Sequence, residues 1–334
     1  MAGASALSGR NMWLGLGKQA VKNTAVAPTK YFEVTEISGI LEEYETKKSD
    51  RRVGSRFKPL GRKTNKKVPL SFSVEANPEN VGLILKLALG AEVVAAAGAA
   101  YQHTFSLAEE LPYFTAVASS ADVASSAAGE TVHQIINCKV VSIKIDATTD
   151  DVIKIAIEAI GTARSAVAAA TFTPDFPDAD PFFAKAEEGQ AKLEIGAAVA
   201  SLAEFDEANE FHLSISNGVA TDMRIDNTDS AFALREGDSE ITGNMKAMYN
   251  RNTLTEIEAF QAGTQRAIRF TATSEEEAAS GYYFTLIFTA DKAKYSGAPA
   301  SWDPDVISAD AAFEVEKTTS YPIISLVNAD AAEY

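Results

Sequence analysis

The strongest constraint on the fold of this chain is a pair of segments in which apolar and polar side chains alternate. In residues 135–145 and 152–160, Val and Ile recur at every second position over much of the length. Side chains of a β-strand point alternately to opposite faces of a sheet, so this pattern is typical of strands with one buried face. The polar turn 146–151 joins the two segments, which predicts an antiparallel hairpin.

Further strands and one helix follow from the same kind of pattern. Strands are expected from Tyr31 onward and over 68–74, 101–107 and 113–118. Asn77-Pro78-Glu79 has the residues of a helix N-terminus, and an apolar stripe runs from there to Gly90, a typical helix stop. The Ala-rich residues 91–100 and the small residues 119–130 are interpreted as loops.

The second half of the sequence repeats the order of elements of the first. The strand–helix–stop segment from Val68 to Gly90 matches the segment from Ile241 to Gly263, and in both Gly follows Asn by 13 positions. We interpret this as an internal duplication, because order, spacing and element type agree together. The other matched positions are Phe32 with Phe211, Gly39 with Gly218, and Tyr113 with Tyr283.

The chain is therefore expected to be mainly β and to contain two tandem domains. Its 334 residues suit two domains, and 46% hydrophobic with 23% charged residues is an ordinary globular balance. The predicted organisation is an extended N-terminal arm over 1–30, a first domain over 31–162, a linker over 163–190 and a second domain over 191–334. No apolar targeting segment is evident, so we expect assembly in a cytosol-like compartment.

A basic segment stands out against an acidic chain. Residues 47–67 hold ten Lys and Arg against one acid and carry +9, while the rest carries −25, which gives the net charge of −16. We expect this segment to be a long exposed loop that contacts an acidic neighbouring copy. Trp13, in the arm, is a second expected contact. The candidate contact residues are Arg51, Arg52, Arg56, Lys58, Arg62, Lys63, Lys66, Lys67 and Trp13.

No enzymatic constellation is evident in the sequence. The single cysteine, Cys138, and three histidines offer little for metal or disulfide chemistry. Gly15-Leu-Gly17 fits a loose dinucleotide fingerprint, but the strand that should precede it is not expected there. We therefore expect no catalytic, cofactor-binding or metal-binding residues, and no cofactor. The acidic body also disfavours general binding to nucleic-acid phosphates.

Several motifs, in their order along the chain, resemble phage tail tube proteins of long, non-contractile tails. They are GLGKQ from Gly15, RRVGSR from Arg51, VPLSFSVEANPE from Val68, LALG from Leu87 and FHLSISNG from Phe211. The resemblance implies β-sandwich domains, each with a short helix, in a subunit that assembles into a β-barrel-lined ring. It implies a virion protein of the tail, whose stacked rings form a hollow conduit for DNA delivery without membrane contact.

Two questions stay open at the level of the sequence. A tail-tip or hub protein, or a receptor- or carbohydrate-binding β-sandwich, is the alternative function, since a fold does not fix its place in a particle. Family subunits of one domain form six-fold rings, but this chain has double length. We expect three chains in a pseudo-hexameric ring, with a hexamer as the alternative, and stacking with itself and with other tail proteins.

Overall fold

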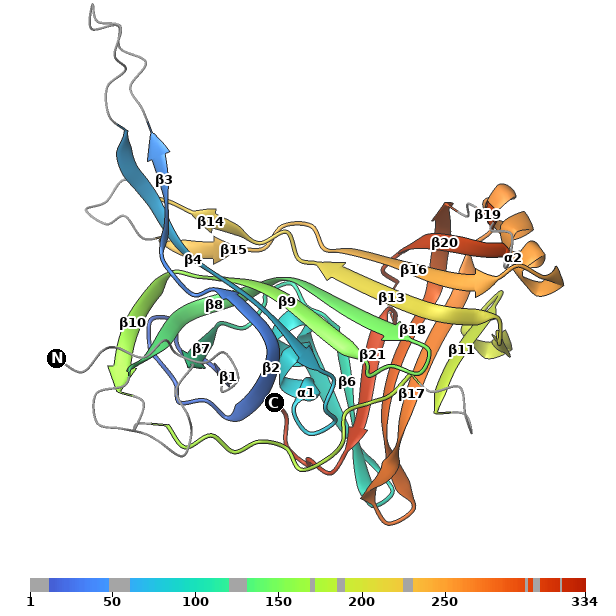
Figure 1. Ribbon diagram of the computed structural model, residues 1–334, viewed down its shortest axis with the longest axis horizontal. Helices are drawn as coiled ribbons and strands as arrows, with labels where there is room; N and C mark the ends of the chain where they lie inside the picture. The colour runs from blue at the N-terminus through green and yellow to red at the C-terminus, as the bar shows by residue number, and fades with distance from the viewer. Residues whose placement is uncertain are drawn as a thin grey trace, which may run out of the picture.

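The computed structural model consists almost entirely of antiparallel β-structure (Figure 1). It describes residues 12–47, 61–119, 131–168, 172–184, 190–224, 231–297, 300–302, 307–318 and 320–334. The first-half strands are β1 (Trp13–Lys18), β2 (Lys30–Gly39), β3 (Glu43–Lys47), β4 (Arg62–Glu75), β5 (Gly90–Ala97), β6 (Ala100–Leu107), β7 (Phe114–Ser119), β8 (Thr131–Thr148), β9 (Lys154–Gly161) and β10 (Ala163–Ala168). Helix α1 (Val81–Leu89) lies between β4 and β5.

The second half is built from similar elements. Its strands are β11 (Ala191–Gly196), β12 (Ala203–Glu204), β13 (Ala208–Ser216), β14 (Ala220–Asp222), β15 (Ala233–Arg235), β16 (Glu240–Met248), β17 (Arg266–Ala279), β18 (Tyr282–Gly297), β19 (Ala300–Trp302), β20 (Ile307–Val315) and β21 (Ile323–Asn328). Helix α2 (Arg251–Gln261) follows β16, and a 3-10 turn (Val199–Ser201) precedes β12.

The first half closes into a barrel. Its strands pair in the order β1–β2–β4–β9–β8–β7, and β7 pairs again with β1. The predicted hairpin 135–160 is confirmed as β8 and β9, in which Ile143 pairs with Ile157 and Ile145 with Ile155. These isoleucines are buried, so the alternation in the sequence does mark the core face.

The second half has the same cyclic order of pairing. β11 pairs with β12, which leads along the chain into β13. β13 pairs with β16, and the order continues through β20, β18 and β17, which pairs with β11. β13 also pairs with β8 of the first half, so one sheet runs through both halves (Figure 1). The match between Tyr113 and Tyr283 does not join equivalent strands, because Tyr113 precedes β7 whereas Tyr283 lies in β18.

Part of the predicted arm is a barrel strand. Residues 13–18 form β1, and Leu14 and Leu16 are buried in the barrel. Gly17 allows this, since a Cβ atom there would lie 2.5 Å from the carbonyl oxygen of Ala27, where the chain returns toward β2. Small residues therefore mark close backbone contact here, whereas the sequence analysis took them as a sign of an arm.

Two further segments differ from expectation. Residues 91–100 were expected as a loop, but β5 occupies 90–97 and pairs with β6 along its length. The predicted linker contains β10 (163–168), which pairs with the first part of β8. In both places short Ala-containing segments become strands because a neighbouring strand supplies the hydrogen bonds, which composition alone does not reveal.

Helix α1 begins and ends near its predicted limits. The Asn77 side chain accepts a hydrogen bond from the Glu79 N–H at 2.9 Å, but the α-helix proper begins at Val81, after a turn. Gly90 ends the helix with φ of 89°, and its N–H donates to the Lys86 carbonyl. Gly90 is thus confirmed as the helix stop, since this backbone conformation favours glycine.

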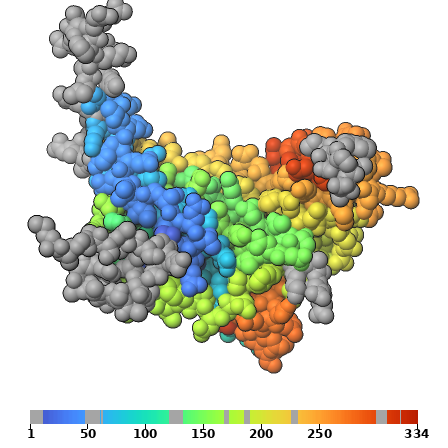
Figure 2. All heavy atoms as spheres, in the orientation of Figure 1, coloured from blue at the N-terminus to red at the C-terminus, as the bar shows by residue number. Residues whose placement is uncertain are grey.

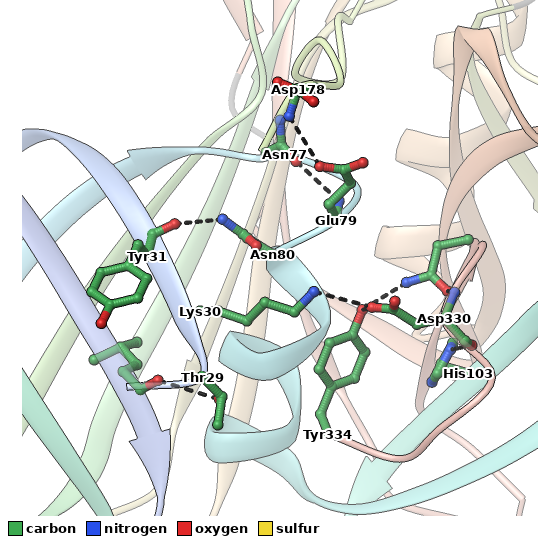
Figure 3. A network of polar contacts seen from close by, with 12 residues as sticks. Thr29, Lys30, Tyr31, Asn77, Glu79, Asn80, His103, Asp178, Asp330 and Tyr334 are labelled. Carbon is green, nitrogen blue, oxygen red and sulfur yellow. Dashed lines mark hydrogen bonds and ion pairs between the residues drawn. The ribbon is translucent and has the colours of Figure 1, made fainter. Parts of the chain in front are cut away.

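The end of the chain covers α1. Figure 3 shows the Tyr334 ring beside the helix, where its hydroxyl donates to Asp330 at 2.9 Å. Lys30 of β2 forms an ion pair with Asp330 at 3.2 Å, and Asn80 donates to the Tyr31 carbonyl. Burial raises the pKa of the Tyr334 hydroxyl well above its usual range. This network fastens the C-terminal segment to the first barrel.

Candidate functional site

The sheet that runs through both halves has one polar face. Strands β4, β9, β8, β13, β16 and β20 lie side by side in that order. Along each of them buried residues alternate with half-buried or exposed ones over most of the length. The buried side chains belong to the core, so the alternate side chains form a continuous outer surface, which we call the polar face.

Residues of the polar face form rows across the strands. One row is Ser71, Glu158, Ser142, Ser216 and Glu240; the next is Ser73, Ala156, Lys144, Ser214, Thr242 and Glu314; the third is Glu75, Lys154, Asp146, His212, Asn244 and Ala312. None of these residues is Phe, Tyr or Trp. Most of these side chains are small or acidic, so few long side chains and no aromatic rings project from this surface.

The charge of the polar face is acidic. The three rows hold five carboxylates and two lysines. Two of the carboxylates contact neutral groups or the histidine: Asp146 lies 2.7 Å from His212 Nδ1, and Glu158 accepts from the Ser142 hydroxyl at 3.1 Å. The surface is therefore partly paired with itself and carries no arginine for phosphate recognition.

The two halves meet in a polar and apolar junction beside this face. Asn217 donates to the carbonyls of Ala88 and Val140 at 2.9 and 3.2 Å. A small apolar cluster of Leu111, Val219 and Leu234 lies next to it. The loop between β13 and β16 is thus packed on the first half.

Glu236 connects this loop to the first barrel. Its carboxylate accepts from the Leu111 N–H at 2.9 Å and forms an ion pair with Lys139. Burial acts to raise the pKa of Glu236, but the hydrogen bonds from Lys139 and Leu111 outweigh it and hold the pKa below its usual value. The ionised form of Glu236 is therefore the one that the junction stabilises.

The basic segment forms the base of a projecting hairpin in the part that the structure describes. β3 pairs with the beginning of β4, and the hairpin protrudes from the body in Figures 1 and 2. Residues 62–67, expected as loop, are therefore strand. Lys66 and Lys67 form ion pairs with Glu42 and Glu43 at 3.5 and 3.7 Å.

The remaining predicted contact residues have different places. Lys63 lies over the Tyr44 ring, 4.8 Å from its centre, and Arg62 begins β4. Arg51, Arg52, Arg56 and Lys58 lie outside the described residues. Trp13 is only 3% exposed and packs edge-on against Tyr31 and Phe172, so it is buried in its own chain. Trp13 belongs to a small buried cluster with Val117 and Val132, which is separate from the main core that holds Leu14 and Leu16.

Metal and membrane features are scarce in the described part of the chain. No group of three or more His, Cys, Asp or Glu side chains is placed to hold a metal ion among the described residues. No helix in these residues is long and apolar enough to span a membrane. Cys138 is buried, which raises the pKa of its thiol far above the usual value.

The polar face was partly visible in the sequence. The alternation in β4, β8 and β9 predicted three of its strands, but β13, β16 and β20 were not recognised as their neighbours. Alternating residues such as Phe211, Leu213 and Ile215 carried the signal. Pairing between β8 and β13 joins residues far apart in the chain, so no local pattern could predict it.

The fold and this face define a structural class of protein: a β-barrel subunit with a broad polar sheet and a projecting hairpin, suited to assembly. A family model described as phage tail tube protein matches residues 9–315. The chain therefore belongs to the phage tail tube protein family. It is a structural subunit of the virion tail, which stacks with itself into a tube and associates with other tail proteins.

Other comparisons add little detail. No curated protein matches the chain. Among solved structures, the chain is similar to the SPP1 tail tube determined by solid-state NMR and cryo-EM, with 15% sequence identity and a TM-score of 0.30. That match covers 43% of this chain and 80% of the other. Membership of a structural family implies a non-enzymatic role.

Proposed function

We propose that the polar face lines the lumen of the tail tube and that DNA passes along it. The observation that carries this proposal is the continuity of the face across both halves, from β4 to β20. A conduit for DNA needs a surface without basic patches or stacking rings, because both bind nucleic acid. Serines, threonines and a carboxylate excess meet this requirement, since they repel phosphates and offer little to stack on.

The proposal includes two equivalent halves in each chain. Paired strands of the two halves share irregularities as well as order. The β2–β4 pairing shifts between Val34 and Glu36, and the β13–β16 pairing shifts between Ala208 and Glu210, each 174 positions later (34 to 208, 36 to 210). A β-bulge at the same place in both pairs supports descent from one duplicated barrel.

Two more bulges support the same equivalence. The β8–β9 pairing shifts between Val140 and Ser142, as the β18–β20 pairing does between Tyr295 and Gly297. Likewise β7–β8 and β17–β18 both shift one residue after the start of the pairing, at Phe114 and Arg266. These correspondences support a register in which Val34 matches Ala208, an offset of 174, whereas the sequence match of Phe32 with Phe211 has an offset of 179.

The strand count supports three chains per ring. Each half contributes four strands in sequence across the sheet: β2, β4, β9 and β8, then β13, β16, β20 and β18. Three chains give a barrel of roughly 24 strands. With about 4.8 Å between strands and a tilt near 40°, its backbone diameter is roughly 50 Å. Side chains reduce this to roughly 40 Å, which accommodates a duplex roughly 20 Å wide.

The basic segment completes the proposal as a contact between subunits. The hairpin of β3 and β4 projects from the body, and the candidate residues Arg51, Arg52 and Arg56 follow β3 in the sequence. An acidic neighbouring copy is its expected partner, because the rest of the chain carries −25. Changing the three arginines to Glu is expected to prevent tube assembly while the purified monomer still folds. Normal tubes from this variant would contradict the contact.

Electron microscopy of tubes assembled from the purified chain tests the ring. Three-fold symmetry with six similar lobes is the expected result. Six copies of the whole chain in one ring would contradict the three-chain arrangement.

Lysine substitution tests the lumen. In one variant Ser71, Ser142 and Ser216 become Lys, and in a matched control Asn252, Thr255 and Gln261 on the exposed side of α2 become Lys. Tubes of the first variant are expected to retain short labelled duplexes inside the lumen. Control tubes are expected to bind the duplexes only at their outer surface. Equal retention of DNA by both variants would contradict the assignment of the polar face to the lumen.

A further inference from the structure

We propose that the buried side chains of His103 and Glu92 hold one proton between them and form a pH-sensitive clip, which fastens residues 329–334 to the first barrel. The clip is closed while the proton is present and opens when the proton is lost. This inference does not depend on the lumen or on the ring arrangement, because every contact of the clip lies within one chain.

Both residues of the clip lie in the interior of the first half. His103 is on β6 and Glu92 is on the neighbouring strand β5, and neither side chain is exposed. The Nδ1 atom of His103 lies 2.8 Å from Oε1 of Glu92. The imidazole also stacks on the Phe105 ring, with 6.3 Å between the ring centres. Water therefore does not reach either group while the clip is closed.

The imidazole ring of His103 has an oxygen at each of its nitrogens. On the side opposite Glu92, Nε2 lies 2.8 Å from the main-chain carbonyl oxygen of Asp330, which can only accept a hydrogen bond. A neutral histidine has a single N–H, so in either tautomer one of the two contacts would place two acceptors against each other. The two contacts therefore need one proton more than a neutral histidine and an ionised carboxylate supply.

The surroundings of Glu92 decide where this extra proton lies. The Tyr334 N–H donates to the carboxylate at 3.1 Å, and Nζ of Lys86 in α1 lies 3.7 Å from it. Both contacts favour the ionised carboxylate, because a hydrogen-bond donor and a cation each stabilise its negative charge. The extra proton therefore belongs to His103, whose ring is the imidazolium ion with an N–H on both sides.

The clip holds both anchor points of the C-terminal segment. The Asp330 carbonyl accepts from His103, and the Tyr334 N–H donates to Glu92. Figure 3 shows His103, Asp330 and Tyr334 gathered beside α1. Residues 331–333, between the two anchors, are exposed, and residues 329–334 belong to no strand or helix. Loss of the proton therefore acts directly on the two points at which this segment is attached.

Other charged groups near the clip come from strands β1 and β2. Lys30 forms an ion pair with the Asp330 carboxylate at 3.2 Å, and Lys18 donates to the main-chain oxygen of Tyr334. The Tyr334 hydroxyl keeps its proton, since burial raises its pKa well above the usual range. These contacts do not involve the proton on His103, so they remain when the clip opens and limit how far the segment moves.

The number of bound protons gives the direction of the pH effect. A histidine that is exposed to water loses its second proton at about pH 6.5. Above that pH the open form holds one proton fewer than the closed form, so raising the pH shifts the equilibrium toward the open form by up to about tenfold per pH unit. Below that pH both forms are protonated and the equilibrium is constant.

A second histidine–carboxylate pair in the same chain serves as a comparison. Nδ1 of His212 lies 2.7 Å from Oδ1 of Asp146, but 36% and 45% of the two side chains are exposed. Water can therefore bind either group after the proton is lost. We expect no segment to move when this pair titrates, because burial is what makes the first pair a clip.

Hydrogen exchange of residues 329–334 in the purified monomer tests the clip. Exchange rates are measured between about pH 6 and about pH 8.5 and corrected for the intrinsic rate at each pH. We expect protection of this segment to fall at least about tenfold over that range. Constant protection would overturn the proposal, and this measurement uses the unmodified chain.

A double variant, Lys86→Met with Glu92→Gln, separates the proton from the other contacts. The amide of the new glutamine donates a permanent N–H to Nδ1 of His103, so the ring needs only its own N–H toward Asp330. Removing Lys86 as well avoids leaving a buried cation without its partner. We expect protection of residues 329–334 to change less than about twofold over the same pH range. A fall as large as in the wild type would overturn the assignment to this pair.

The matched control is Asp146→Asn, which makes the same change from carboxylate to amide at the exposed pair. It is expected to keep the wild-type pH dependence of residues 329–334. Loss of that dependence in the control would show that a distant charge drives the opening, which would also overturn the clip. If the double variant fails to fold, the wild-type titration and this control still decide the question.

Discussion

Helices α1 and α2 follow corresponding strands, β4 and β16, but they have opposite surroundings. All nine residues of α1 are buried, and its sequence VGLILKLAL is apolar almost all round. Only Thr253 and Ala259 of α2 are buried, and its sequence RNTLTEIEAFQ is largely polar. A helix that is buried on every side must be apolar on every side, whereas a surface helix needs one apolar stripe.

The difference arises from what covers each helix. In the first half, the strands β5 and β6 come between α1 and β7 in the sequence. β21 pairs with β6 and extends the sheet that they form. In the second half only residues 262–265 separate α2 from β17. The Tyr334 ring adds to the cover, since a Cβ atom at Gly82 would lie 2.1 Å from it. The β5–β6 hairpin and the C-terminal segment therefore cover α1, whereas most of α2 stays at the surface.

The largest contrast is expected from truncating one residue in each helix. Leu85 is fully buried, so Leu85→Ala is expected to lower the free energy of unfolding by about 2–5 kcal/mol. Glu258 is the exposed control, and Glu258→Ala is expected to change it by less than about 0.5 kcal/mol. Urea denaturation of the monomer measures both. Similar losses would show that α2 is covered as fully as α1.

The junction provides a second contrast, between Lys139 and its counterpart Lys294. Lys139 is 4% exposed and faces Glu236, whereas Lys294 is exposed and forms no ion pair in the described residues. Lys139→Met is expected to lower the free energy of unfolding by about 3 kcal/mol at pH 7, because it leaves the partly buried Glu236 carboxylate without its cation. Lys294→Met is expected to be nearly neutral in the monomer.

The pH dependence checks the cause of that loss. Because the pKa of Glu236 is lowered in the folded chain, its contribution is complete above the unfolded value of about 4.3 and is lost as the pH falls through the folded value. The difference between Lys139→Met and wild type should therefore narrow below about pH 4.3. A constant difference would point to lost packing instead of lost charge.

Closure of the two barrels offers a third, smaller contrast. Four residue pairs join β1 and β2, while only two join β11 and β12, supplemented by the Phe205 N–H donating to the Leu193 carbonyl. We expect amides of β11 and β12 to exchange at least about tenfold faster than those of β1 and β2, a difference of about 1.4 kcal/mol in opening free energy. Equal protection would mean that packing, and not the number of pairs, holds the second barrel closed.

The smallest expected effect concerns how the helices start. The Asn250 side chain accepts hydrogen bonds from the N–H groups of Asn252 and Thr253, whereas Asn80 makes no such bond at the start of α1. Asn250→Ala is expected to lower the free energy of unfolding by about 1 kcal/mol, and Asn250→Ser by much less, because serine also caps helices. Thermal unfolding followed by circular dichroism distinguishes the two. The Asn250 side chain also donates a hydrogen bond to the Glu207 carboxylate at 2.9 Å, and a loss as large in Asn250→Ser would assign the effect to that bond.

Local patterns in the sequence determined most of the secondary structure. Alternation set β8, β9 and the second part of β4, and Gly90 set the end of α1. The charge difference between 47–67 and the remainder was likewise a property of composition. These features follow from a few neighbouring residues, because strand pleat, helix capping and charge density act over short distances.

Tertiary structure decided what those elements became. The segment containing Trp13 has the composition of an arm, yet it is a barrel strand because β2 and β7 supply partners on both of its edges. The polar face exists only because β8 pairs with β13. Contacts between residues far apart in the chain depend on which strands find each other, and alternation specifies a face of each strand without specifying its neighbour.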